Sequence, residues 1–168
     1  MLYIQLIGLL AFCMLVLSFY RKDAKSILMF QSTANFAYAV HYFLLGAISG
    51  AYISLISILR NVLLSIAKKN KILIAIFIVI LYLVVTFIFY ENIYSVFPMT
   101  ANTIFLIAIL KDSKMSLLKG QLVGSVLWFT YGVSVSSYVE MVAQVILAIS
   151  VIIQIKNMPK KENTEVKG

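Results

Sequence analysis

The sequence predicts an all-α integral membrane protein in which seven spanning helices form two parallel three-helix repeats joined by a linker helix. Three observations support this fold class. Of the 168 residues, 62% are hydrophobic and 12% are charged, and the mean hydropathy is +1.01, whereas a soluble domain is about half apolar. Short polar breaks separate long apolar stretches. Two of these stretches, in opposite halves of the chain, carry similar motifs.

A helix that spans a bilayer needs about 20 mostly apolar residues. The stretches that meet this requirement cover 2–19, 27–46, 50–67, 72–90, 95–110, 116–134 and 138–155. No basic segment or small-residue cleavage site marks the first stretch as a signal peptide, so we expect it to remain as a helix. The fourth stretch has Tyr82 and Thr86 as its only polar interior side chains. It reads as the linker, since one extra crossing lets both repeats start on the same side of the membrane.

The pairing of helices into repeats rests on an internal echo in the sequence. A shift of 86 residues aligns Val40 with Val126, Tyr42 with Trp128, Phe43 with Phe129, Gly46 with Gly132, and Tyr52 with Tyr138. The segment 22–25 (Lys-Asp-Ala-Lys) also reappears as 111–114 (Lys-Asp-Ser-Lys). The expected divisions are a first repeat over 1–67, a linker helix over 68–92, a second repeat over 93–156 and a disordered cytoplasmic tail over 157–168.

The basic residues predict the orientation in the membrane. If the polar breaks are assigned alternately to the two sides, every lysine and arginine except Arg60 falls on one side. The other side holds only the acids Glu91 and Glu140, which we place at the outer edge. Basic residues stay on the cytoplasmic face, so we expect the N-terminus outside and the C-terminus inside. The net charge of +8 then reflects orientation and contact with lipid headgroups, and nucleic acid is not an expected partner.

No group of residues for catalysis or metal binding stands out in the sequence. Cys13 is the only cysteine and His41 the only histidine, which excludes an intrachain disulfide and a metal site built from thiolates. The chain has no phosphate-binding loop and no nucleophile motif. We therefore expect no metal, no cofactor and no enzymatic activity.

Arg60 is the most unusual residue of the apolar stretches, because a charge inside a membrane needs a partner or a polar cavity. It lies eight residues before Lys68, about 12 Å along a helix. If Arg60 faces a cavity, it favours an anionic or strongly polar solute, since guanidinium binds carboxylate or phosphate in a fork. Snorkelling to the interface, or a structural pairing with backbone carbonyls, is the alternative explanation.

Other polar and aromatic residues are candidates for the same cavity. Asn35 and Asn102 lie near the middle of their helices, where an amide binds a polar solute or ties two helices together. Trp128 and Tyr42 occupy matched positions in the two halves. Their rings either wall a solute cavity or anchor the helices at the membrane surface.

Two further residues carry more specific expectations. His41 lies near the outer surface, and its imidazole is a candidate for proton coupling; a hydrogen-bonded packing role is the alternative. Pro98, early in the fifth stretch, is a candidate hinge because a proline loosens the backbone hydrogen bonding of a helix.

These motifs resemble two known families. Pro98, the segment 111–114 and the motif 128–132 (Trp-x-x-Tyr-Gly) follow one another as in the second repeat of SWEET and PQ-loop transporters. The segments 41–46 (His-Tyr-Phe-Leu-Leu-Gly) and 57–61 (Ser-Ile-Leu-Arg-Asn) resemble the YgjV family of bacterial inner-membrane proteins. The resemblances imply a three-plus-one-plus-three helix arrangement, a route between two bundles and a location in the bacterial inner membrane.

The resemblance to SWEET transporters also implies site residues. In that family an Asn on the third helix of each repeat and a Trp on the second contact the solute, and Asn61 and Trp128 match these in type. Tyr42 stands where the other Trp is expected, and Gln144 is the nearest amide to the other Asn position. The first helix lacks the family's proline, and Arg60 has no counterpart in the family. Both departures favour a small polar or anionic metabolite over a sugar.

The leading expectation is a facilitative transporter of small polar solutes that alternates between outward and inward access. The predicted binding residues are Asn35, Tyr42, Arg60, Asn61, Asn102, Trp128 and Gln144. The alternative is a non-transporting membrane scaffold or lipid-interacting protein on the same fold, whose polar groups satisfy one another in a dry interior. Membrane lipids are expected partners in both cases, and the sequence leaves open whether the protein is a homo-oligomer.

Overall fold

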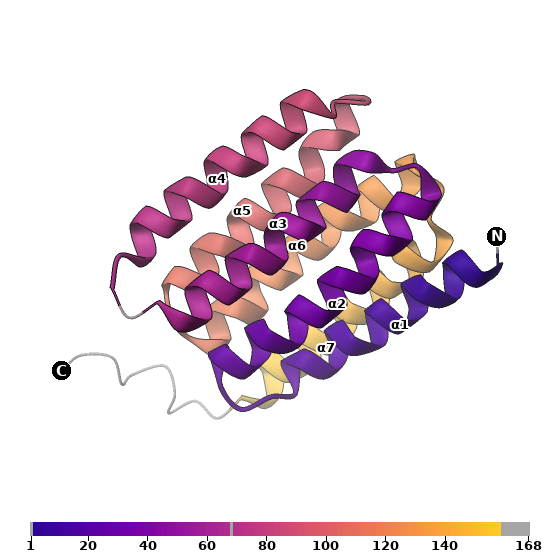
Figure 1. Cartoon of the computed structure of the whole chain (residues 1–168). Helices are drawn as coiled ribbons and strands as arrows, with labels where there is room; N and C mark the ends of the chain where they lie inside the picture. The colour runs from indigo at the N-terminus through magenta and orange to yellow at the C-terminus, as the bar shows by residue number, and fades with distance from the viewer. Residues whose placement is uncertain (1, 68, 159–168) are drawn as a thin grey trace.

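The computed structural model describes residues 2–67 and 69–158, and this part of the chain consists of helices and short connections (Figure 1). The elements are α1 (Leu2–Phe19), α2 (Ala24–Leu45), α3 (Ile48–Ile66), α4 (Lys71–Ile88), the 3₁₀ helix η1 (Ile93–Ser95), α5 (Val96–Leu110), α6 (Lys114–Ser134) and α7 (Tyr138–Asn157). The predicted all-α class is confirmed, and the helix ends lie within a few residues of the predicted ones. From residue 159 onward, the predicted tail lies outside the described residues.

Local sequence explains where several helices begin and end. The carboxylate of Asp23 accepts a hydrogen bond from the backbone N–H of Ser26 at 2.8 Å and caps the start of α2. The hydroxyl of Ser113 accepts one from the N–H of Ser116 at 3.1 Å at the start of α6. Gly46 ends α2 with a φ of 77°, a left-handed conformation that glycine adopts without steric cost. The two similar basic segments of the sequence thus precede helices that begin with side-chain caps.

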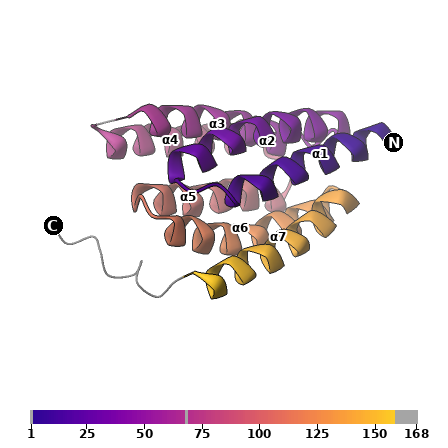
Figure 2. The same cartoon turned by 90° about the horizontal axis from the view of Figure 1, so that it is seen from below.

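The helices form two layers. Figure 2 shows α1 to α4 on one side and α5, α6 and α7 on the other. In the first layer α2 packs between α1 and α3, and in the second α6 packs between α5 and α7. The layers meet where α1 packs against α7 and where α3 packs against α5, while α4 lies along one edge against α3 and α5.

Several helices are suited to a membrane. In the described residues, α1, α3, α4, the segment Ile93–Leu110 and α7 are long and apolar enough to span a bilayer, which makes five candidate spans. The prediction from sequence was seven. The remaining helices, α2 and α6, have 22 and 21 residues but are not among the candidates. They are the central helices of the two layers and carry many of the polar residues of the interior.

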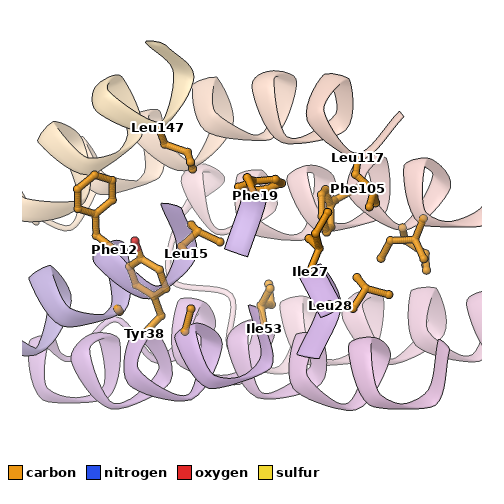
Figure 3. Packing of buried hydrophobic residues seen from close by; sticks show 14 of the residues in the cluster. Phe12, Leu15, Phe19, Ile27, Leu28, Tyr38, Ile53, Phe105, Leu117 and Leu147 are labelled. Carbon is orange, nitrogen blue, oxygen red and sulfur yellow. The ribbon is translucent and has the colours of Figure 1, made fainter. Parts of the chain in front are cut away.

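The core lies between the two layers. Figure 3 shows side chains of α1 and α7, among them Phe12, Leu15, Phe19 and Leu147, in the space between the layers. The outer surface is also apolar; Phe87 of α4, for example, is 86% exposed. In a bilayer such side chains face lipid tails, so their exposure has no cost.

The helix α4 contacts the bundle through one stripe only. Its buried residues are Ala75, Ile78, Tyr82 and Thr86, which recur at helical spacing and therefore share a face. The two polar side chains that the sequence places inside this helix are thus the ones that it turns toward the protein. The division into two repeats and a linker remains a prediction.

Candidate functional site

A cavity of about 50 Å³ lies between the layers, lined by residues from every α-helix except α4. One water molecule needs roughly 10–15 Å³ of such space, so the cavity has room for a few waters or a very small solute. Of the predicted binding residues, all but Asn61 line it. These are Asn35, Tyr42, Arg60, Asn102, Trp128 and Gln144.

The cavity has two different ends. Arg60 lies twelve residues into α3, about 18 Å along the helix axis. Glu140 lies two residues into α7, about 3 Å along its axis. Both helices start at the same end of the bundle (Figure 1). We call the surroundings of Arg60, Asn102 and Phe105 the Arg60 end, and those of Glu140, Gln144, Tyr38 and Tyr42 the Glu140 end.

At the Arg60 end, the guanidinium is held by the protein itself. Arg60 is 2% exposed. Its Nε donates to Asn61 Oδ1 at 2.9 Å, and its Nη1 donates to Asn102 Oδ1 at 2.9 Å and to the Tyr82 hydroxyl at 3.3 Å. The ring of Phe105 lies 5.0 Å from the guanidinium carbon, within the range of a cation–π contact. Asn61 is therefore a partner of Arg60 without lining the cavity.

A hydrogen-bonded cluster extends this end across three helices. Ser57 Oγ lies 2.9 Å from both Asn102 Oδ1 and the Tyr82 hydroxyl. Asn102 Nδ2 donates to the carbonyl of Pro98 at 2.9 Å. Pro98 lies in the first turn of α5, where its missing N–H interrupts no helical hydrogen bond. The proposed hinge function of Pro98 stays a prediction.

At the Glu140 end, aromatic rings and a carboxyl group meet. The ring of Tyr42 stacks on that of Trp128 with centroids 5.5 Å apart, and on that of Tyr38 at 6.0 Å. Glu140 is 2% exposed, and its Oε1 accepts a hydrogen bond from Gln144 Nε2 at 2.7 Å. Glu140 lies in the first turn of α7, and its side chain points into the protein. Its predicted place at the outer edge of the membrane stays a prediction.

Several polar atoms at this end have no hydrogen-bond partner among the described residues. They are Glu140 Oε2, Gln144 Oε1 and the hydroxyls of Tyr38 and Tyr42, of which the Tyr42 hydroxyl faces the Glu140 carboxyl. All four belong to residues that line the cavity. Buried polar groups are rarely left without a partner, because the loss of their hydration costs free energy. Near the depth of Arg60 the corresponding atoms are Gln31 Nε2, of a residue that lines the cavity, and Asn61 Nδ2, of a residue that does not.

His41 lies outside the cavity lining. Its Nδ1 lies 2.8 Å from the carbonyl oxygen of Ile4, and its Nε2 lies 3.0 Å from Ser137 Oγ. The ring packs against Gly8, where a Cβ atom would approach it to 2.8 Å. These contacts tie α1, α2 and the start of α7 together and match the packing alternative. Proton coupling through His41 stays untested.

The start of α3 depends on residues that the sequence did not single out for this role. Tyr131 of α6 accepts a hydrogen bond from the Gly50 N–H at 3.0 Å and lies 3.0 Å from Ser49 Oγ. The Glu91 carboxylate accepts one from the Ile48 N–H at 2.9 Å. The residue before α3, Ala47, offers no side-chain cap. Within the described residues, no three His, Cys, Asp or Glu side chains gather as a metal site would require.

The comparisons with known proteins give one result. A family model described as bacterial inner membrane protein, Imp-YgjV, matches residues 2–162. Comparison with the curated proteins and with solved structures gives no match. The match covers nearly the whole chain, and it agrees with the apolar helices that the structure contains. The protein therefore belongs to the Imp-YgjV family of bacterial inner membrane proteins.

Proposed function

We propose that the protein is a facilitative transporter of small polar solutes in the bacterial inner membrane. The observation that carries this proposal is the cavity between the layers, lined by amides, aromatic rings, Arg60 and Glu140 from both halves of the chain. Polar side chains are costly inside a membrane, and they commonly mark the path of a substrate. Binding sites of transporters lie near the middle of the bilayer, where two repeats meet.

The proposed mechanism is alternating access between a first unit, α1 to α3, and a second unit, α5 to α7, with α4 as the linker in a SWEET-like arrangement. The packing of the layers supports this division. Exchange of the two units would replace α1 by α5 and α3 by α7, which turns the α1–α7 contact into the α3–α5 contact. A two-fold axis along the membrane normal relates parallel repeats in this way. The N-terminus would lie outside and the C-terminus in the cytoplasm.

In this mechanism the two units rock about the cavity so that its polar lining opens first to one side and then to the other. The solute must bind with similar strength in both orientations, because a ligand shifts a two-state equilibrium only by its differential affinity. The stacked rings of Tyr42 and Trp128 belong to different units. When the two units rock, these two rings would therefore separate or slide past each other.

A second candidate function is a non-transporting membrane scaffold. One observation favours it: the guanidinium of Arg60 is held by Asn61, Asn102 and Tyr82, which is what a structural role requires. The unpartnered atoms of the Glu140 end favour the transporter instead, because a scaffold has no reason to keep them.

Cysteine labelling tests alternating access without knowledge of the solute. The Cys13→Ser variant has no cysteine, and Asn35→Cys in this background places a thiol in the cavity lining. Phe36→Cys is the matched control, because the neighbouring Phe36 is 60% exposed on the apolar surface. Membrane-impermeant thiol reagents are added to right-side-out and inside-out vesicles. The proposal expects position 35 to be labelled from both sides and position 36 from neither. No labelling of position 35 from either side would favour the scaffold, and labelling from one side alone would contradict alternating access.

A further inference from the structure

We propose that the Glu140 end of the cavity binds the ammonium group of a small amine. This inference rests on the proposed function, since it names the class of solute that the same cavity takes. It differs from the expectation of an anionic solute, which concerned the guanidinium of Arg60 at the other end of the cavity.

The charges of the cavity favour a cation. Arg60 donates through Nε and Nη1 to Asn61, Asn102 and Tyr82, and it lies about 15 Å deeper along the bundle than Glu140, so its positive charge is remote from the Glu140 end. Glu140 has no basic side chain within ion-pair distance among the described residues, where Lys71 and Asp112 form the one ion pair. A buried carboxylate needs a proton or a cation to compensate the loss of hydration. An ammonium group provides that charge and can donate to Glu140 Oε2 and Gln144 Oε1, which both lack partners.

The aromatic rings beside Glu140 suit the same ligand. Tyr38, Tyr42 and Trp128 form a continuous stack that lines the cavity. Faces of tyrosine and tryptophan rings attract cations through their negative charge density, and more strongly where water is excluded; here the faces left free are the outer ones of Tyr38 and Trp128, because Tyr42 lies between these two rings. The unpartnered hydroxyls of Tyr38 and Tyr42 can accept hydrogen bonds from an ammonium group as well. A carboxylate together with aromatic faces is a chemistry that selects amines against neutral solutes of equal size.

The size of the cavity restricts the amine. A volume of about 50 Å³ has room for only a few heavy atoms, as in methylamine, ethylamine or ethanolamine. The ethanolamine headgroup of a phospholipid carries the same group but brings a phosphate and two acyl chains, which this space does not hold. We therefore assign the site to a free amine, and the lipid headgroup is tested as the other source.

Trp128 provides a direct readout of binding, because it is the only tryptophan of the chain and lines the cavity. Purified full-length protein is titrated with methylamine, ethylamine and ethanolamine, and its tryptophan fluorescence is recorded. Ethanol and acetate serve as neutral and anionic solutes of similar size. We expect a saturable change with the amines and none with ethanol or acetate.

The variant Glu140→Gln preserves the shape of the side chain and removes its charge. Truncation of one partner of a buried charge pair weakens binding by roughly 30-fold or more, and this is the expected loss of amine affinity. Glu91→Gln is the matched control, because Glu91 is exposed and bonds the start of α3 outside the cavity. Its affinity should stay within about twofold of the wild type. Tyr42→Phe, which removes one unpartnered hydroxyl, should bind several-fold more weakly. The thermal midpoint and the fluorescence of each ligand-free variant verify that it is folded.

The outcomes separate this inference from the proposed function. No response to the amines, or an unchanged affinity in Glu140→Gln, overturns the amine site even if position 35 is labelled from both sides. If amine binding requires Glu140 but position 35 is not labelled, the amine site is supported and the transporter proposal is overturned. A response to short-chain phosphatidylethanolamine but not to free amines overturns the assignment to a free amine.

Discussion

Both ends of the cavity contain a buried charged side chain beside amides and aromatic rings, but the polar atoms of the two ends differ in how many hydrogen bonds they make within the protein. At the Arg60 end, the charged group donates through Nε and Nη1 to side chains of α3, α4 and α5. At the Glu140 end, four polar atoms of α2 and α7 lack partners among the described residues. A buried group that is already bonded stabilises the fold, whereas an unbonded one has capacity for a ligand. The difference teaches that the most unusual residue of the sequence need not be the one available for binding.

The largest effect should follow when the Arg60 end loses its acceptor. Asn102→Leu removes the oxygen that accepts from Arg60 Nη1 and lies beside Ser57 Oγ. A buried cation left with fewer partners costs about 3 kcal/mol, so we expect a large fall in the thermal midpoint of the detergent-purified protein. In the double variant Arg60→Met, Asn102→Leu, no charge remains uncompensated and most of the loss should be restored. A double variant that is less stable than either single one would contradict this account of the Arg60 end.

Packing beside the Arg60 end can be tested with two neighbouring glycines of α6. A Cβ atom at Gly120 would lie 2.7 Å from the Cβ of Ala108 and 3.6 Å from Phe105, whose ring covers Arg60. Gly120→Ala should therefore cost about 1–3 kcal/mol through overpacking. At Gly124 the nearest atom would lie at 3.9 Å, an ordinary contact, so Gly124→Ala should leave the stability unchanged or raise it slightly. Equal effects of the two changes on the unfolding midpoint would argue against close packing at Gly120.

A smaller effect is expected at His41, which belongs to neither end. Ser137→Ala removes the hydroxyl 3.0 Å from His41 Nε2 and should cost about 1 kcal/mol, the usual value for one buried hydrogen bond. Titration through Trp128 fluorescence should give an unchanged amine affinity, because His41 does not line the cavity. A clear loss of amine affinity in this variant would mean that His41 influences the Glu140 end.

The smallest effect concerns Asp23, outside the cavity. Hydrogen bonds from the backbone N–H and the hydroxyl of Ser26 lower the pKa of Asp23 below its ordinary value of 3.8. Because the folded-state pKa is the lower one, the stabilisation is fully present above 3.8 and is lost as the pH falls through the folded-state value. The difference in thermal midpoint between wild type and Asp23→Ala should thus be constant near neutral pH and shrink below pH 3.8. If the difference in thermal midpoint grew on acidification, the stabilisation by Asp23 would not come from its ionised carboxylate.

The sequence predicted where the helices lie better than it predicted which side chains contact one another. Apolar stretches between short polar breaks predicted the helices, because each break contains charges or turn-forming residues that a spanning segment excludes. Of the predicted binding residues, Asn61 was the one that fell outside the cavity lining. Glu140 was missed because a charge near a helix start normally faces water. Its spacing of four from Gln144 offered a signal, but α7 is apolar on most of its surface, so the pattern does not tell which face is buried.

The hydrogen bonds at the start of α3 have a consequence for how the protein is made. The N–H groups of Ile48 and Gly50 are bonded by Glu91 and Tyr131, which follow 43 and 81 residues later in the chain. During synthesis the first three helices therefore enter the membrane before these acceptors exist. The first turn of α3 must therefore stay in contact with water, or with the insertion machinery, until the second half of the chain is inserted. The halves are then not independent assembly units, and separate expression of residues 1–67 should give a product that membrane quality-control proteases remove unless residues 68–168 are supplied in the same cell.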